Sequence, residues 1–279
     1  MDSLGNSSAE TDLVVPAESM VNEFGNSVSR REAILMRFPI LIGVLVLFGG
    51  VRICPAADTP AGTKPICVVL IGGIDSDPTP EQIAGTAPRG IGQSGMYQLA
   101  SDLTRAGVTT EYFNWNGSRA GRFHENPLHS EGIADYIRDH RAARPHEKVV
   151  IVGNSWGGHT AWEVCEALSE PEVPVEMVLF LDPSSTGRSK TARPPQLPKC
   201  VRQARNYYTR NLFGWREWAG EERLANIDLG DPAYGFRIPG GPRYESKLDP
   251  QAHIAAEWDP RIHQEFHQRI LELVDSMPQ

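Results

Sequence analysis

The sequence has few cysteines and no excess of positive charge, and each shortage excludes a class of protein. The four cysteines, Cys54, Cys67, Cys165 and Cys200, form neither a CxxC pair nor the His and Cys spacing of a zinc site, so we expect no structural zinc. Asp and Glu number 35 against 27 Lys and Arg, which gives a net charge of −8. Because nucleic-acid binding needs a concentrated basic surface, we expect no nucleic-acid partner.

Long apolar runs are also scarce, and the longest one lies near the N-terminus. Residues 38–51 are apolar, but the run is shorter than the roughly 20 residues that span a bilayer comfortably. Arg30, Arg31 and Arg37 precede it, and the small residues at positions 54–57 follow it. A basic stretch, a short apolar stretch and small residues at a cleavage point are the parts of a secretory signal.

This pattern predicts the organisation of the chain. We expect residues 1–35 to be a disordered or untranslated extension, and residues 36–57 to be a signal peptide that begins at the true start, Met36. The protein would then be exported, to the periplasm or the extracellular space. The alternative is an uncleaved anchor that holds it on a membrane through residues 38–51. Residues 58–279 are enough for one globular domain.

The most informative stretch of that domain predicts a buried strand, a tight turn and a helix. Residues 149–152 are an unbroken run of β-branched side chains, as in a parallel strand that is covered on both faces. Ala161, Cys165 and Leu168 then recur on one face of a helix. The turn between them, residues 153–157, has the sequence GNSWG, which is a GxSxG motif.

Ser155 is the central residue of this motif. A serine on a strained strand-to-helix turn exposes its hydroxyl at the carboxyl end of a sheet, and small neighbours leave room for the turn. With the strand directly before it and the helix directly after it, the chain from about residue 65 to its C-terminus resembles the α/β-hydrolase family. The resemblance implies a nucleophilic Ser155. The alternative is a glycine-rich turn with a bystander serine.

Strands and helices alternate along the rest of the domain. Further strands are expected at residues 66–71, 111–115, 175–181 and 204–209. Further helices are expected at residues 96–106, 133–140 and 260–273. This alternation indicates an α/β fold, with a mostly parallel central sheet and helices on both faces.

A serine hydroxyl needs an imidazole to accept its proton, and five histidines are candidates for this task. The resemblance implies the chain order serine, acid, histidine, which favours His253, His263 and His267 over His124 and His129. His263 and His267 adjoin core positions of the last helix and also fit solvated helix histidines. His253 lies in a predicted loop, from which its ring can reach the carboxyl edge of the sheet. We therefore expect His253 to be the general base.

The carboxylate that orients this histidine has two candidates. Asp182 ends the strand after the helix of the motif, so it should lie at the same sheet edge as Ser155. Most α/β hydrolases have the acid one strand later, where Asp228 is the candidate, whereas animal pancreatic-type lipases have it at the earlier position in a similar Leu-Asp-Pro context. Asp182 is our first choice and Asp228 the alternative. Asp182 also fits a plain Asp-Pro turn.

Two backbone N–H groups should bind the oxyanion that forms during acyl transfer. The resemblance implies the N–H of Trp156, the residue after the nucleophile. The second donor should come from the loop after the strand at residues 66–71, which makes Gly73 or Ile74 the candidate. The glycines of this loop also fit a simple turn.

A GxGxxG pattern at residues 90–95 suggests a dinucleotide site, but that motif must directly follow a strand. Pro78, Pro80 and Pro88 intervene, so we do not expect such a site. No metal or organic cofactor is implied.

Together these features predict an exported serine hydrolase that cleaves carboxylic esters through an acyl-enzyme on Ser155, with a small-molecule or lipid ester as substrate. Lipids are included because Trp156, Phe213, Trp215 and Trp218 could line an apolar acyl site, although these aromatics also fit a core. The alternative from another class is a non-catalytic binding module with an α/β-hydrolase fold.

Overall fold

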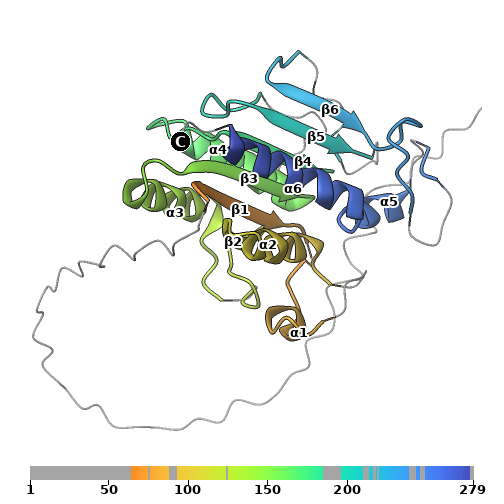
Figure 1. Ribbon diagram of the computed structural model, residues 1–279, viewed down its shortest axis with the longest axis horizontal. Helices are drawn as coiled ribbons and strands as arrows, with labels where there is room; N and C mark the ends of the chain where they lie inside the picture. Colours follow the sequence, from red (N-terminus) through yellow and green to blue (C-terminus); the bar gives the residue numbers. More distant parts are fainter. Residues whose placement is uncertain are drawn as a thin grey trace, which may run out of the picture. The chain divides into compact units, whose positions relative to one another are not determined.

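One sheet of six strands, each parallel to its neighbours, forms the centre of the part of the chain that the computed structural model describes (Figure 1). The described residues are 64–74, 76–87, 93–123, 125–184, 196–209, 214–215, 218, 220–238, 243–245 and 249–276. The strands are β1 (Ile66–Gly72), β2 (Thr109–Asn114), β3 (Lys148–Asn154), β4 (Met177–Leu181), β5 (Ala204–Tyr208) and β6 (Leu224–Asp228). Their order across the sheet is β2-β1-β3-β4-β5-β6.

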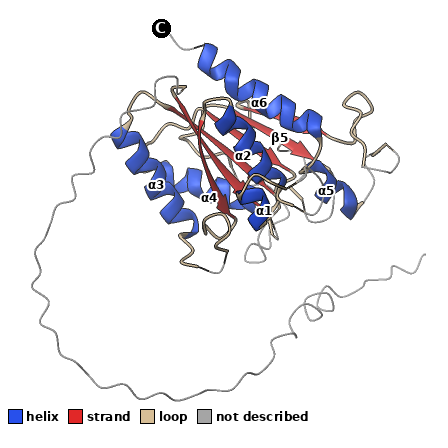
Figure 2. Ribbon diagram, turned by 60° about the horizontal axis from the view of Figure 1, so that its bottom comes forward, coloured by secondary structure: helices blue, strands red, loops and turns tan. Residues whose placement is uncertain are grey.

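Helices cover both faces of this sheet, as Figure 2 shows. They are α1 (Pro80–Ile83), α2 (Gly95–Arg105), α3 (His129–Ala143), α4 (Trp156–Leu168), α5 (Pro250–Ala256) and α6 (Pro260–Asp275). Helices α2 and α6 pack on one face, and α3 and α4 pack on the other. The predicted fold class is thus confirmed.

The central strands are buried on both faces because their side chains alternate between two cores. In β1, Val68 and Leu70 pack with α2 and α6, whereas Val69 and Ile71 pack with α3 and α4. All seven residues of β1 are buried. Each such aliphatic side chain contributes about 1.5–3 kcal/mol when it is removed from water. The side chains of an unbroken apolar run can therefore all be buried, alternately in one core and in the other.

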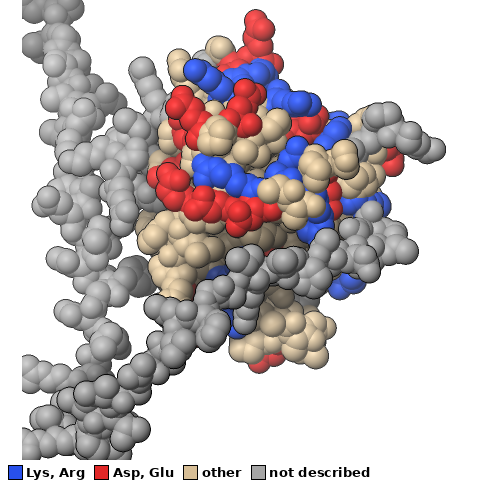
Figure 3. Space-filling model, turned by 90° about the vertical axis from the view of Figure 1, so that its left-hand side faces the viewer, with Lys and Arg blue, Asp and Glu red and all other residues tan. Residues whose placement is uncertain are grey.

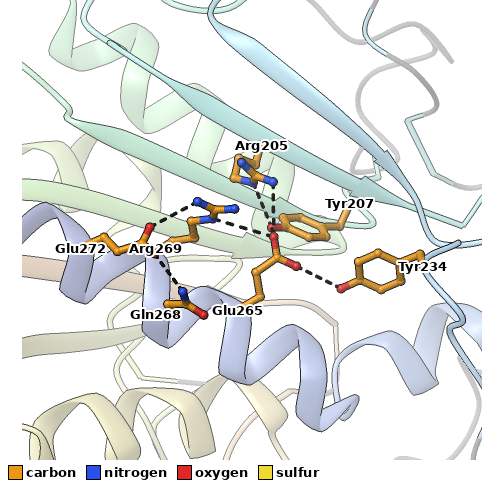
Figure 4. Close-up of polar contacts among 7 residues, drawn as sticks. All are labelled: Arg205, Tyr207, Tyr234, Glu265, Gln268, Arg269 and Glu272. Carbon is orange, nitrogen blue, oxygen red and sulfur yellow. Dashed lines mark hydrogen bonds and ion pairs between the residues drawn. The ribbon is translucent and has the colours of Figure 1, made fainter.

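Helix α6 begins as its sequence predicts. Asp259 is the N-cap and accepts hydrogen bonds from the backbone N–H groups of Arg261 and Ile262, and Pro260 is the first helical residue. On the side towards β5, the carboxylate of Glu265 accepts hydrogen bonds from the Tyr207 hydroxyl at 2.6 Å and the Arg205 guanidinium at 3.3 Å (Figure 4). Polar contacts thus join this helix to the sheet alongside its apolar stripe.

The amino ends of the strands form a charged surface on which Lys and Arg are interspersed with Asp and Glu (Figure 3). Glu176, just before β4, pairs with Arg202 at 3.1 Å and with Lys148 at 3.7 Å.

Among the described cysteines, Cys165 and Cys200 are buried free thiols, and the Cys200 thiol donates to the carbonyl of Cys165 at 3.1 Å.

The predicted N-terminal extension, residues 1–35, and the predicted signal or anchor, residues 36–57, lie outside the described residues. Within the described part of the domain, no helix combines the length and the apolar character needed to cross a membrane.

Candidate active site

Ser155 lies at a sharp turn between β3 and α4. Its backbone has φ 53° and ψ −124°, which is rare for a residue with a side chain. The turn needs its glycines: a Cβ on Gly153 would lie 2.6 Å from the carbonyl oxygen of Gly157, and a Cβ on Gly157 would lie 2.3 Å from the carbonyl oxygen of Ile71. The two glycines of the motif are therefore steric requirements of this turn.

The register of the sheet places Asp182 beside Ser155. Asn154 and Leu181 are partners in the pairing of β3 with β4, so the residue after each strand emerges at the same edge. Asp182 is fully buried, and its Oδ1 accepts a hydrogen bond from the backbone N–H of Thr209 at 2.9 Å. The Thr209 hydroxyl donates to its Oδ2. A buried carboxylate is tolerable because it is hydrogen-bonded in this way.

His253 bridges these two residues. Its Nε2 lies 2.8 Å from the Ser155 hydroxyl, and its Nδ1 lies 2.6 Å from Oδ2 of Asp182. With the proton on Nδ1, which faces the carboxylate, Nε2 presents its lone pair to the hydroxyl. The arrangement is one in which the serine can give its proton to the imidazole while the carboxylate fixes the ring.

His253 lies in a helix, whereas the sequence predicted a loop. Helix α5 is only seven residues long, begins at Pro250, and is capped by the side chain of Asp249, which accepts from the backbone N–H of Gln251 at 2.9 Å. The prediction was wrong about this local structure. A helix this short leaves too little periodicity for recognition from spacing alone.

The surroundings of His253 change its proton affinity. Burial alone would lower the pKa of the imidazole, but the hydrogen bond and negative charge of Asp182, together with the charge of Glu257, outweigh it and raise the pKa above its usual 6.5. The imidazolium form, which appears when the ring takes a proton from serine, is therefore stabilised.

The other candidate acid and histidines lie elsewhere. Oδ1 of Asp228 accepts the backbone N–H of Gly230 at 2.9 Å in the turn after β6, and the carboxylate that contacts His253 is that of Asp182. His263 contacts the carbonyl oxygen of Glu257 at 2.7 Å. His267 lies half-buried on α6 and His129 lies exposed at the start of α3. His124 falls outside the described residues.

Of the predicted oxyanion donors, Gly73 adjoins the nucleophile. A Cβ on Gly73 would lie only 2.8 Å from the Cβ of Ser155, so its backbone passes directly over the serine. Ile74 follows with its side chain 49% exposed. Trp156 is the first residue of α4, and the first N–H groups of a helix have no acceptor within it. Its amide and the loop after β1 thus flank the serine.

Comparison with known proteins establishes the family. The family model "Alpha/beta hydrolase family" matches residues 93–274, which is more than half of the chain. The chain belongs to the alpha/beta hydrolase family. No curated protein matches it by sequence.

Solved structures with this fold resemble the hydrolase at low sequence identity. An α/β serine hydrolase without a lid from Xanthomonas campestris is 14% identical, with a TM-score of 0.41, and the match covers 77% of this chain and 85% of that one. The catalytic core of the acetyl xylan esterase from Trichoderma reesei is 16% identical, with a TM-score of 0.37, over 77% of this chain and 99% of that one.

Some residues of the hydrolase site were not predicted. The Ser184 hydroxyl lies 3.4 Å from that of Ser155. Thr209 donates two hydrogen bonds to the Asp182 carboxylate, one from its backbone N–H and one from its hydroxyl. Thr209 directly follows β5, so its position at the end of a parallel strand was the available signal.

The aromatic residues suggested for an acyl site differ in their surroundings. Trp215 and Trp218 are 2% and 4% exposed and belong to the core beside α4, so the substrate interpretation was wrong for these two. Phe213 falls outside the described residues. Trp156 is half-buried and packs edge-on against Trp115, with ring centroids 4.9 Å apart. Of these aromatic residues, Trp156, which directly follows Ser155, therefore stays a candidate for the acyl site.

The GxGxxG pattern ends at the start of α2, and the part of it that the structure describes forms a helix cap. Ser94 is the N-cap and accepts from the backbone N–H of Tyr97. The first two N–H groups of the helix, those of Gly95 and Met96, donate to the Glu257 carboxylate at 2.9 and 3.2 Å. The position that a pyrophosphate would need is thus filled by a side chain of the hydrolase itself.

No group of three or more His, Cys, Asp and Glu side chains is arranged to hold a metal ion among the residues described in the structure.

Proposed function

We propose that this hydrolase cleaves carboxylic esters through an acyl-enzyme on Ser155. The observation that supports this is the bridge made by His253, which lies 2.8 Å from the serine hydroxyl and 2.6 Å from Asp182. Nucleophile and base within hydrogen-bond reach, with the base oriented by a third group, form the arrangement that activates a serine.

The reaction would proceed in two halves. Oγ of Ser155 attacks the ester carbonyl while Nε2 of His253 accepts its proton, and the imidazolium that forms lies against the Asp182 carboxylate. The negative oxygen of the tetrahedral intermediate is bound by the amide of Trp156 and a second amide from the loop at Gly73. His253 then protonates the alcohol that leaves. In the second half, His253 activates water, which releases the acid and restores the serine.

We also propose that the ester has an apolar part, lipid chains included. Two exposed apolar side chains directly follow site residues: Ile74, 49% exposed, follows Gly73, and Ile254, 55% exposed, follows His253. Exposed aliphatic side chains that adjoin site residues in the sequence favour an apolar group over a highly charged one. A series of p-nitrophenyl esters of increasing chain length tests this, since a kcat/KM that falls steadily from acetate upward would contradict it.

The test of the mechanism is the variant Ser155→Ala. Wild-type protein should react covalently with a fluorophosphonate, and the variant should neither react nor turn over any ester above the background rate. Wild-type protein that is folded but unreactive would instead support the non-catalytic binding module.

Export remains a proposal of ours that is based on the basic and apolar stretches at residues 30–57. N-terminal sequencing of the mature protein should show cleavage after Ala56 or Ala57. An intact N-terminus upstream of Arg30 would contradict it.

A further inference from the structure

Glu257 lies one helical turn after His253, at the C-cap of α5, and its carboxylate contacts two other segments. Its Oε1 accepts the backbone N–H groups of Gly95 at 2.9 Å and Met96 at 3.2 Å. Both carboxylate oxygens lie 3.4 Å from the hydroxyl of Ser76, in the loop after β1. One side chain therefore joins the helix of the base, the start of α2 and the loop that contains Gly73.

The contact with α2 needs an acceptor and favours a negative one. The first N–H groups of a helix lack acceptors within it and carry partial positive charge. Ser94 satisfies the third N–H, that of Tyr97, and the Glu257 carboxylate satisfies those of Gly95 and Met96. The packing is close, because a Cβ on Gly95 would lie 2.2 Å from the carbonyl oxygen of Glu257. The end of α5 is thereby fixed against α2.

The contact with Ser76 fixes the loop on the other side of the nucleophile. Ser76 is buried, and its carbonyl oxygen accepts a hydrogen bond of 2.5 Å from the Tyr112 hydroxyl of β2. Its own hydroxyl meets Glu257. The loop is therefore held at Ser76 from two directions, three residues after Gly73, whose backbone passes over Ser155.

Glu257 and His253 also interact through their charges. Burial raises the pKa of Glu257, and the N–H groups of Met96 and Gly95, the charge of His253 and the Ser76 hydroxyl oppose this rise. In turn, Glu257 adds to the effect of Asp182 on the pKa of His253. Among the described residues, the charged groups that act on the imidazole are Asp182, just after β4, and Glu257, just after α5. The Tyr244 phenol, in the segment before α5, interacts with Asp182.

We propose that Glu257 is a positioning residue of this active site: its carboxylate holds the loop at Gly73 and the helix of His253 in place on either side of Ser155, and its charge stabilises the imidazolium. This inference depends on the proposed serine chemistry. Glu257 contacts neither the serine nor, in the proposed mechanism, the ester, so it acts through its neighbours.

The experiment measures how fast a fluorophosphonate labels Ser155 across a range of pH in the full-length protein. The variant Glu257→Gln keeps the size and an oxygen acceptor but removes the charge. Its labelling should decline at a lower pH than in the wild type, because the imidazole loses one of the carboxylates that raise its pKa. The plateau rate at high pH should fall less than about tenfold, because the acceptor remains.

Glu257→Asp tests the positioning separately. It keeps the charge but shortens the side chain by one methylene, so the contacts with α2 and Ser76 should be lost. The plateau rate should fall by about 10- to 100-fold, the loss expected when reacting groups shift by up to an ångström. The pH of half-maximal labelling should remain closer to wild type than in Glu257→Gln.

A matched control is Glu265→Gln on α6. Glu265 is also a partly buried, hydrogen-bonded carboxylate, held by Tyr207 and Arg205 (Figure 4), but it is not among the groups that shift the pKa of His253. This variant should lose stability in thermal unfolding and keep the wild-type pH profile. A pH profile of Glu257→Gln that coincides with that of the control, or a wild-type plateau in Glu257→Asp, would overturn the proposal. A wild-type protein that is not labelled would overturn the serine chemistry instead.

Discussion

The carboxyl and amino ends of the parallel strands differ in the burial and in the partners of their charged side chains. At the carboxyl ends, Asp182 is fully buried and is held by Thr209 and His253. At the amino ends, Arg202 pairs with Glu176, and 62% of the Arg202 side chain is exposed. The amino ends also have a buried carboxylate beside a histidine, since Glu147, just before β3, lies 2.6 Å from His140. The other ring nitrogen of His140 faces the Arg144 guanidinium at 3.3 Å, whereas that of His253 faces the Ser155 hydroxyl.

This difference indicates where chemistry takes place. Burying a carboxylate costs several kcal/mol that hydrogen bonds and a partner must offset, whereas an exposed pair gains only about 0–1 kcal/mol. A buried carboxylate next to a histidine is informative about function where the same imidazole also contacts a serine hydroxyl, as it does at Asp182 and His253. Variants at the two ends should therefore have very different effects on activity and stability.

The largest effect is expected for Asp182→Asn. The amide cannot hold the imidazole in the tautomer that accepts the serine proton, so kcat should fall by about 10⁴-fold. Steady-state kinetics with an activated ester measures this loss. The matched control is Asp228→Asn, which replaces the carboxylate at the end of β6 and should retain wild-type kcat. The reverse result would make Asp228 the acid.

Gly73→Ala should have the next largest effect. The new Cβ would lie 2.8 Å from the Cβ of Ser155 and 3.1 Å from Oδ1 of Asn154, so the loop must move away from the serine. Loss of one oxyanion donor lowers kcat by about 100-fold or more. Gly85→Ala is the control, since its Cβ meets no atom within 4 Å; its φ of 71° should cost some stability, but kcat should be unchanged. Wild-type kcat in Gly73→Ala would exclude this loop from the oxyanion site.

The pH dependence should be smaller, about tenfold for each pH unit. His253 accepts a proton only when it is neutral, so kcat/KM should fall as the pH drops through its pKa. Because Asp182 and Glu257 raise this pKa above 6.5 against the opposing effect of burial, the decline should begin above pH 6.5. A pH profile of kcat/KM measures it. A profile that is flat down to pH 5 would contradict the raised pKa.

The smallest effect is expected at the other end of the strands. Arg202→Ala removes an exposed partner of Glu176, which keeps its contact with Lys148 at 3.7 Å. Urea unfolding should show a loss of no more than about 1 kcal/mol. The kcat should be unchanged, and a substantial loss of activity would show that the two ends are coupled.

Much of this architecture could be predicted because its signals are local. An unbroken apolar run, as in β3, requires burial on both faces, and the GxSxG motif requires a turn that only small neighbours permit. Asp182 could be proposed from its place at the end of a strand, since parallel strands bring their carboxyl ends to one edge. The pairing of Asn154 with Leu181 then sets the proximity of Ser155 and Asp182.

The remaining features depend on contacts between distant segments. Glu257 and Ser76 are 181 residues apart in the sequence, and no local pattern marks either of them as a partner. Helix α5 does have a local signal in its sequence, because Asp249 and Pro250 repeat the Asp-Pro start of α6. Trp215 and Trp218 could not be assigned to core or substrate, since an aromatic side chain fits both.

The distance along the chain between nucleophile and base has a consequence for synthesis of the protein. Ser155 and His253 are separated by 98 residues. At about 5–20 residues per second, the ribosome adds the serine roughly 5 to 20 seconds before the histidine. During that interval the imidazole of His253 does not yet exist, so in the proposed mechanism the hydroxyl lacks its base. We therefore expect that the nascent chain, and any fragment that stops before α5, does not cleave esters.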